Sequence, residues 1–141
     1  MFEAKSHLSE ISGLHIKQDR NYRQQQNDEL KINSIKNSSK YYNCKNYSED
    51  VWVGKYYQIA NRLSFLQKLK ELQIDYEQYS DVKLVFINFI NDNTLISSKP
   101  VKCSEEWDNH YQQIFKEMCL DLEVLKKKGV LIINIDVSQW T

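Results

Sequence analysis

The sequence has no excess of charge of either sign, because its 141 residues contain 19 Lys and Arg and 19 Asp and Glu. A protein that attracts nucleic acid or a membrane surface through its overall field carries a clear surplus of positive charge. A global field of that kind is excluded here, so any electrostatic recognition must come from a local group of residues.

Paired cysteines and long apolar runs are also missing. Cys44, Cys103 and Cys119 are odd in number, lie far apart and form no CxxC motif, so they suggest neither a disulfide framework nor a zinc knuckle. The longest apolar run, at residues 82–90, has about half the length that a membrane-spanning helix needs. No basic-then-apolar signal peptide precedes the first strand. We therefore expect a cytoplasmic protein without a membrane partner.

The chain does contain enough apolar residues for one domain. Hydrophobic residues make up 41% of it, and a chain of this length buries a core as a single domain, residues 1–141. Strand-like segments at residues 1–7, 82–90 and 130–137 alternate with helical ones. This order predicts an α/β fold with a layered sheet whose strands are joined by parallel crossovers.

Two segments have the apolar spacing of amphipathic helices. The first begins near Asp50, and its apolar stripe comprises Tyr56, Ile59, Ala60, Leu63, Leu66 and Leu69. The second is capped by Ser104, and its stripe comprises Trp107, Tyr111, Ile114, Phe115 and Met118. A weaker pattern predicts a helix capped by Asn27, with an apolar side of Leu30, Ile32, Ile35 and Tyr42.

Residues 9–49 form a variable polar segment with few large aliphatic side chains. Its second half holds the only basic and aromatic patch of the chain, which includes Lys36, Lys40, Lys45 and Tyr41. Lysines contact phosphates and aromatic rings stack on bases, so these four residues are candidates for binding nucleic acid. The same composition is also typical of a solvated loop without a ligand.

A second candidate site lies at the first strand, where Glu3, Lys5 and His7 share one face. A carboxylate binds Mg²⁺, and a lysine two residues along can hold a phosphate oxygen or the attacking water beside it, as metal-assisted phosphodiester hydrolysis requires. The alternative is an ordinary solvated strand face, since E-x-K is a common tripeptide.

A polar helix face supplies further groups for this candidate site. Gln58, Asn61 and Arg62 stand at positions i, i+3 and i+4 of the helix that begins near Asp50. Gln and Arg there could bind phosphate or orient the site, Arg through its planar fork.

The chain resembles a group of uncharacterised bacterial proteins with the PD-(D/E)XK, restriction-endonuclease-like nuclease fold. The segments that carry the resemblance are FEAKSHLSE, YYQIANRLSFLQKL, VKLVFINFIND, SEEWDNHYQQIF and IINIDV. The resemblance implies a central mixed sheet flanked by helices, Mg²⁺ as cofactor and DNA as substrate. It also implies that Glu3 binds the metal, that Lys5 is catalytic and that Gln58 supports them.

One departure from that superfamily concerns its first metal-binding aspartate. The superfamily carries this residue on a helix and two strands ahead of the E-x-K strand, whereas Glu3 is the third residue here. The resemblance therefore implies an incomplete core, truncated before that strand. Glu10, Asp19, Asp92 and Asp136 are the acids left open as replacements, and no spacing identifies one of them.

Two functions remain open at this point. The first is a Mg²⁺-dependent DNA endonuclease-like hydrolase, inactive or impaired alone because the first aspartate is absent. The second is a non-catalytic module on the same fold that binds nucleic acid or a protein. The sequence does not indicate an oligomeric state.

Overall fold

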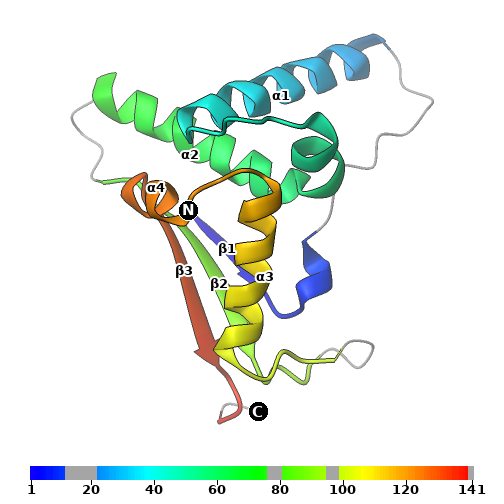
Figure 1. Cartoon of the computed structure of the whole chain (residues 1–141), viewed down its shortest axis with the longest axis vertical. Coiled ribbons are helices and arrows are strands. Elements are labelled where there is room, and N and C mark those ends of the chain that lie inside the picture. The colour runs from blue at the N-terminus through cyan, green and yellow to red at the C-terminus, as the bar shows by residue number, and fades with distance from the viewer. Residues whose placement is uncertain (12–21, 76–80, 95–98, 140–141) are drawn as a thin grey trace.

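The computed structural model describes residues 1–11, 22–75, 81–94 and 99–139 (Figure 1). Their elements, in chain order, are β1 (Phe2–Lys5), the 3₁₀ helix η1 (Leu8–Glu10), α1 (Tyr22–Tyr41), the π-helical segment η2 (Asp50–Lys55), α2 (Tyr57–Asp75), β2 (Leu84–Ile90), α3 (Ser104–Glu117), α4 (Leu122–Lys127) and β3 (Val130–Asp136). The α/β class expected from the sequence is confirmed.

The sheet contains three strands in the order β1-β2-β3. Phe2 is paired with Val85, and Val85 with Leu131, and both pairings are parallel. The mixed sheet that the resemblance implies is therefore wrong for the described residues. The reason is that helical crossovers join the strands, and a crossover returns the chain to the same end of the sheet.

Helix α3 packs on one face of this sheet, where it contacts the central strand β2. Trp107 Nε1 donates a hydrogen bond to the Phe89 carbonyl oxygen at 3.1 Å, and the Tyr111 ring lies 5.5 Å from the Phe86 ring. The apolar stripe expected for this helix is buried throughout. Its N-cap is Cys103 rather than Ser104, because Ser104 already belongs to the helix.

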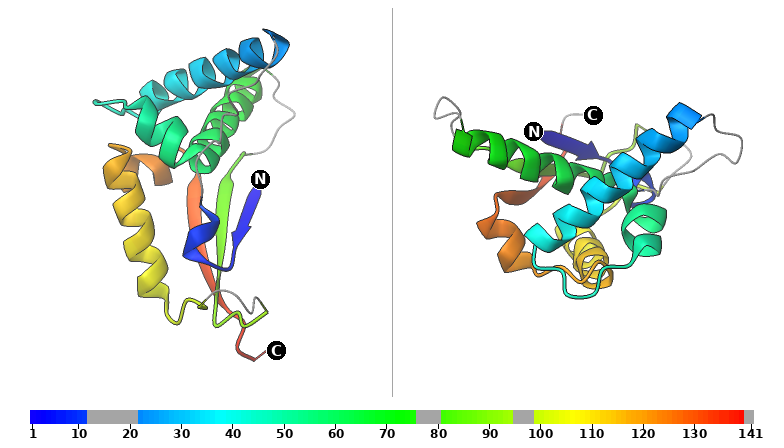
Figure 2. Two further views of the ribbon diagram at one scale, coloured as in Figure 1. Left: turned by 90° about the vertical axis from the view of Figure 1, so that its right-hand side faces the viewer. Right: turned by 90° about the horizontal axis from the view of Figure 1, so that it is seen from above.

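Helices α1 and α2 form a second layer at one end of the sheet (Figures 1 and 2). The Tyr42 hydroxyl donates to the Leu63 carbonyl oxygen at 3.0 Å, and Ile35 and Leu66 are fully buried nearby in the same core. Asn27 is not an N-cap, since α1 begins at Tyr22. Leu30 was also expected on the buried side and is exposed.

The segment η2 leads into α2. The sequence pattern predicted one helix beginning near Asp50 and did not distinguish η2 from α2. Trp52 in η2 is fully buried, and its Nε1 donates to the Met118 carbonyl oxygen at 3.1 Å. This bond attaches the start of α2 to the end of α3. The bond thereby helps to position α2 beside the end of α3.

The face of the sheet opposite α3 is not covered by any described helix, as the left view of Figure 2 shows. The expectation of a sheet flanked by helices therefore holds for one side only among the described residues. None of the helices in the described part of the chain is long and apolar enough to span a membrane.

Candidate functional site

The polar side of β1 faces the helices, and its apolar side faces outward. Lys5 and the following His7 are buried, and the Glu3 side chain is only 15% exposed, whereas Phe2 is 71% exposed. The alternation read from the sequence thus separates the two sets of side chains correctly. The charged set lies inside because α2 presents partners for it.

Glu3 is the centre of a small ionic cluster. Lys5 Nζ lies 3.1 Å from Glu3 Oε1, and Arg62 Nε donates to Glu3 Oε2 at 2.6 Å. Arg62 comes from α2 and is 59 residues away in the chain. Both carboxylate oxygens are therefore engaged by cations.

Lys5 is held by three acceptors. Besides Glu3, its Nζ donates to Gln58 Oε1 at 2.9 Å and to the Glu10 carbonyl oxygen at 3.2 Å. An ammonium group has three protons, so these contacts saturate it. The structure thus brings together Glu3, Lys5, Gln58 and Arg62, which we call the Glu3 cluster.

The electrostatics of the Glu3 cluster favour an anion. Burial raises the pKa of Glu3, but the hydrogen bonds from Arg62 and Lys5 outweigh it, so the pKa lies below its ordinary value and the group is ionised at neutral pH. Two cations against one carboxylate leave a positive surplus. Arg62, whose side chain is 41% exposed, is the part of the cluster that solvent reaches.

The residues present do not fit a Mg²⁺ ion as they lie. The cluster has one carboxylate, whereas Mg²⁺ needs several oxygen ligands in octahedral geometry. The cavity beside it, lined also by Tyr111, measures about 10 Å³, which is room for one water molecule at most. No group of three His, Cys, Asp or Glu that could hold a metal occurs among the described residues.

The acids left open as replacements have other partners. The Glu10 carboxylate accepts from the Ser6 and His7 backbone N–H groups, each at 2.8 Å. Asp92 accepts from the Ser6 hydroxyl at 2.6 Å, and Asp136 accepts from Asn91 and from the Ser138 backbone. Asp19 lies outside the described residues.

His7 lines a separate pocket of about 580 Å³ between η1 and residues 99–102. Its Nδ1 lies 3.3 Å from the Lys99 carbonyl oxygen, and its buried Nε2 has no hydrogen-bond partner within the described part of the chain. His110 is also partly buried, which lowers its pKa. Sequence reasoning missed this pocket, because no spacing connects His7 with Lys99.

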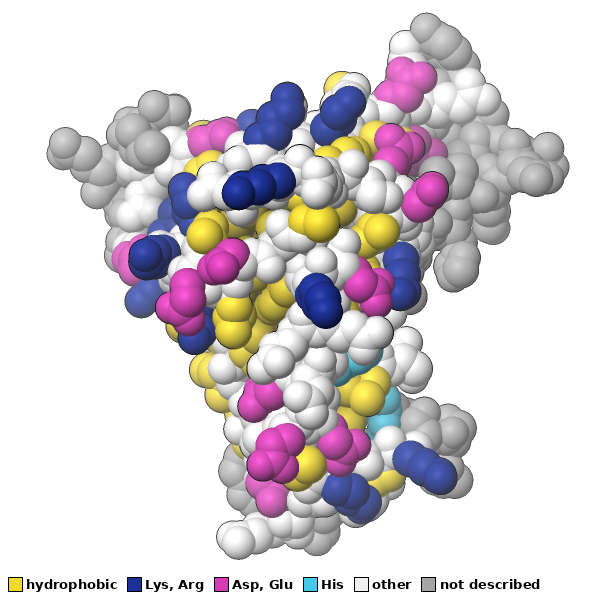
Figure 3. Space-filling view, viewed as in Figure 1, with side chains coloured by type: hydrophobic (Ala, Val, Ile, Leu, Met, Phe, Trp, Pro, Cys, Tyr) yellow, Lys and Arg dark blue, Asp and Glu magenta, His cyan; other side chains and the backbone are white. Residues whose placement is uncertain are grey.

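The basic patch of α1 lies on the surface. Lys36 and Lys40 are exposed one turn apart near the end of α1, and Lys45 is exposed just after it. The structure adds Lys128, whose Nζ lies 4.0 Å from the centre of the Tyr41 ring. Figure 3 shows Lys and Arg side chains spread over α1 and α4 on this face. We call Lys36, Lys40, Lys45 and Lys128 the basic surface.

Tyr41 contacts two neighbouring side chains through its ring. Lys128 Nζ lies over its ring, and the Tyr42 ring stands nearly perpendicular to it, with ring centres 4.9 Å apart. It therefore positions Lys128 beside the end of α1. The sequence carried no signal for this contact, since 87 residues separate the two partners in the chain.

Comparison of the chain with protein-family models, with curated proteins and with solved structures found no match.

Proposed function

We propose that the protein is a non-catalytic nucleic-acid-binding module whose basic surface holds the phosphate backbone. The observation that carries the proposal is the contact between Lys128 and Tyr41, which joins two lysine groups from distant parts of the chain. Four lysines on one surface create the local positive field that a neutral chain lacks overall.

The state of the Glu3 cluster supports a binding role over a catalytic one. Its carboxylate is neutralised by Lys5 and Arg62, and its cavity is too small for a hydrated metal. The positive surplus and the exposure of Arg62 suit a phosphate group.

Fluorescence anisotropy with labelled DNA and RNA, titrated with NaCl, tests the proposal. The affinity should fall as salt rises, because bound lysines release counterions from the phosphates. The variant Lys36→Ala/Lys40→Ala/Lys45→Ala should bind more weakly, and the slope of log K against log salt should become shallower by roughly 2 to 3.

A matched control replaces three exposed lysines elsewhere, as Lys68→Ala/Lys83→Ala/Lys102→Ala. This variant should keep the affinity and the salt slope. Equal losses in both variants, or binding that is independent of salt, would refute the basic surface as the site.

A second candidate function is phosphodiester cleavage of the restriction-endonuclease-like kind. It is favoured by one observation, the contact of Lys5 with both Glu3 and Gln58, the three residues for which the resemblance implies catalytic roles. Because this cluster alone does not fit Mg²⁺, we propose activity only where a further carboxylate comes from outside the described residues.

Nicking of supercoiled DNA in the presence of Mg²⁺ or Mn²⁺ tests this candidate. Glu3→Gln and Lys5→Met should each abolish nicking, while Lys68→Met should leave it intact. Nicking that survives both cluster substitutions would exclude the cluster as its source.

A further inference from the structure

β3 is an edge strand whose outer side has free backbone groups. It pairs with β2 on one side and with no strand of the described chain on the other. The Gly129 carbonyl oxygen and the Val137 N–H both bond to β2. Since backbone groups alternate along a strand, those of residues 130, 132, 134 and 136 point away from β2.

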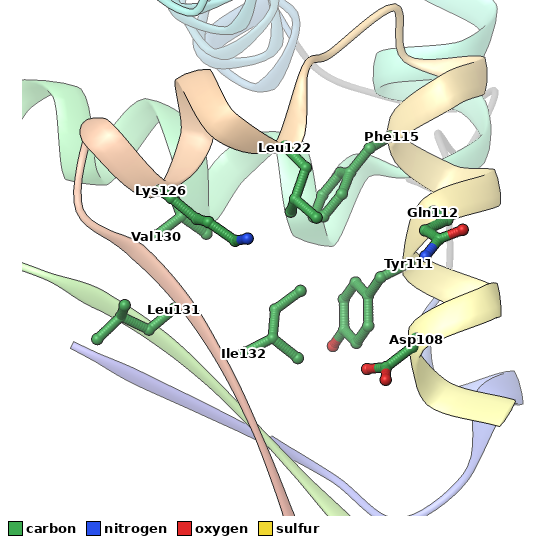
Figure 4. A pocket seen from close by; sticks show the side chains of 9 residues that line it. All are labelled: Asp108, Tyr111, Gln112, Phe115, Leu122, Lys126, Val130, Leu131 and Ile132. Carbon is green, nitrogen blue, oxygen red and sulfur yellow. The ribbon is translucent and has the colours of Figure 1, made fainter. Parts of the chain in front are cut away.

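The side chains around this edge are apolar on both faces of the sheet. Leu131 and Ile133 are 38% and 45% exposed on the face away from α3. On the α3 side, a pocket of about 380 Å³ opens beside the strand, with Phe115, Leu122 and Ile132 among its lining residues (Figure 4). Proteins usually protect long edges with charges, proline or bulges, and residues 130–135 contain no charge and no proline.

Charges of opposite sign stand at the two ends of the edge. Lys126 lies in the last turn of α4 and lines the pocket; it pairs with Glu123 at 2.9 Å, and Lys127 and Lys128 follow it before β3 begins at Val130. Asp136 and Asp108 lie at the other end, and the Asp108 carboxylate accepts a hydrogen bond from Asn134 Nδ2 at 3.2 Å. If a second copy of β3 lay antiparallel beside this one, charges of opposite sign would meet at each end of the edge. A parallel copy would bring like charges together.

We propose that a second copy of this chain docks antiparallel on the β3 edge and extends the sheet to six strands. The interface is isologous, because the same strand supplies both sides around a two-fold axis. The outward backbone groups allow a register centred on Ile133, which pairs β3 over its full length, Val130–Asp136. In it Val130 faces Asp136 of the second copy, and Ile132 faces Asn134 of the second copy.

This register also buries the exposed side chains of β3. Ile133 meets its own counterpart at the two-fold axis, in a non-hydrogen-bonded pair where side chains approach most closely. Leu131 lies beside Ile135 of the second copy on the same face. Lys126 lies near Asp136 of the second copy, and the symmetry produces this charge pair twice.

Sedimentation velocity of the full chain over a range of concentrations tests the proposal through charge reversal. The wild-type chain should form a dimer, and Lys126→Asp and Asp136→Lys should each raise its dissociation constant by about tenfold, since two attractive pairs become repulsive. The double variant Lys126→Asp/Asp136→Lys should restore dimerisation. Circular dichroism verifies that each variant is folded.

Cross-linking provides a test that does not depend on charge. Ile133→Cys should give a disulfide-linked dimer on mild oxidation, whereas Ile87→Cys, its neighbour on β2 in the same row, should give no more than the wild-type chain with its three cysteines. A chain that stays monomeric overturns the proposal. The proposal is also overturned if the double variant does not dimerise, if both cysteine variants cross-link equally, or if a strand of a different protein occupies the edge.

Discussion

Among single residues, Glu3 holds two cations, Lys5 and Arg62, through its two carboxylate oxygens. Replacing it by Gln keeps the shape of the side chain but leaves Lys5 buried without its ion pair. We expect Glu3→Gln to lower the free energy of unfolding by about 1–3 kcal/mol. Urea denaturation measures this loss.

The matched control for Glu3 is Glu71, which pairs with Lys68 on the exposed surface of α2. Glu71→Gln should cost less than about 0.5 kcal/mol, because exposed ion pairs contribute little. Equal costs for the two substitutions would show that the Glu3 cluster behaves as a surface pair.

Asp92 is the residue with the clearest pH signature. Hydrogen bonds from Ser6 and Thr94 lower the pKa of Asp92 from 3.8 to about 2. A carboxyl group whose pKa is lower in the folded state stabilises the fold above its unfolded pKa. That stabilisation, about 1–2 kcal/mol, is lost as pH falls from about 4 to about 2.

The variant Asp92→Asn should therefore be less stable at pH 7 and should lose less stability between pH 4 and pH 2. Urea denaturation at a series of pH values measures both effects. Parallel curves for the variant and the wild-type chain in that window would contradict the role given to Asp92.

The sequence predicted which residues belong to the Glu3 cluster better than it predicted their pairing. The E-x-K spacing and the i, i+4 spacing of Gln58 and Arg62 were sufficient to propose a shared site. That Arg62 neutralises Glu3 depends on how α2 crosses β1, a tertiary arrangement to which the bond from Trp52 to Met118 contributes. No local spacing contains that information.

Secondary structure elements with continuous apolar patterns were predicted best. β2, β3 and α3 lie close to where the sequence placed them, because their apolar patterns are continuous; β2 and α3 bury theirs, whereas β3 leaves Leu131 and Ile133 exposed. α1 was misjudged because much of its buried side is small or polar: Ser38, Ser39 and Asp28 are buried, while Leu30 is exposed. α4 was missed, since its six residues show too little periodicity.

The turn between α4 and β3 depends on Gly129. Its φ of +91° lies in the left-handed region, and a Cβ there would lie 3.1 Å from the Val82 carbonyl oxygen. We expect Gly129→Ala to destabilise the protein by about 1–3 kcal/mol, measured as a lower melting temperature.

Gly54 in η2 provides the comparison, because a Cβ there meets no described atom within 4 Å. Gly54→Ala should leave the melting temperature unchanged or raise it, since alanine loses less conformational entropy in a helical turn. A larger loss at Gly54 than at Gly129 would contradict this account.

The whole molecule has a one-sided arrangement: α3 covers one face of the sheet, α1 and α2 lie at one end of it, and no described helix covers the opposite face. Two phenylalanines on adjacent strands report the difference between the faces. Phe86 points toward α3 and is 1% exposed, whereas Phe2 points away. Phe86→Ala should cost about 3–5 kcal/mol of folding free energy and Phe2→Ala less than about 0.5 kcal/mol, as chemical denaturation measures.

Dye binding provides a second measurement of the same asymmetry. Phe2→Ala should reduce the fluorescence of an apolar dye such as ANS bound to the folded protein, because it removes exposed apolar area. A large loss of stability in Phe2→Ala would mean that its side chain is covered in solution.

The parallel pairing of β1 with β2 has a consequence for how the chain folds during synthesis. The first residue bonds to the carbonyl oxygen of Lys83, 82 residues later. At roughly 5–20 residues per second, β1 leaves the ribosome several seconds before its partner strand exists. Closing so long a loop costs entropy that local helices do not incur. The strand that carries Glu3 and Lys5 is thus made well before its partner strand β2, and we expect the ionic cluster to assemble late in folding.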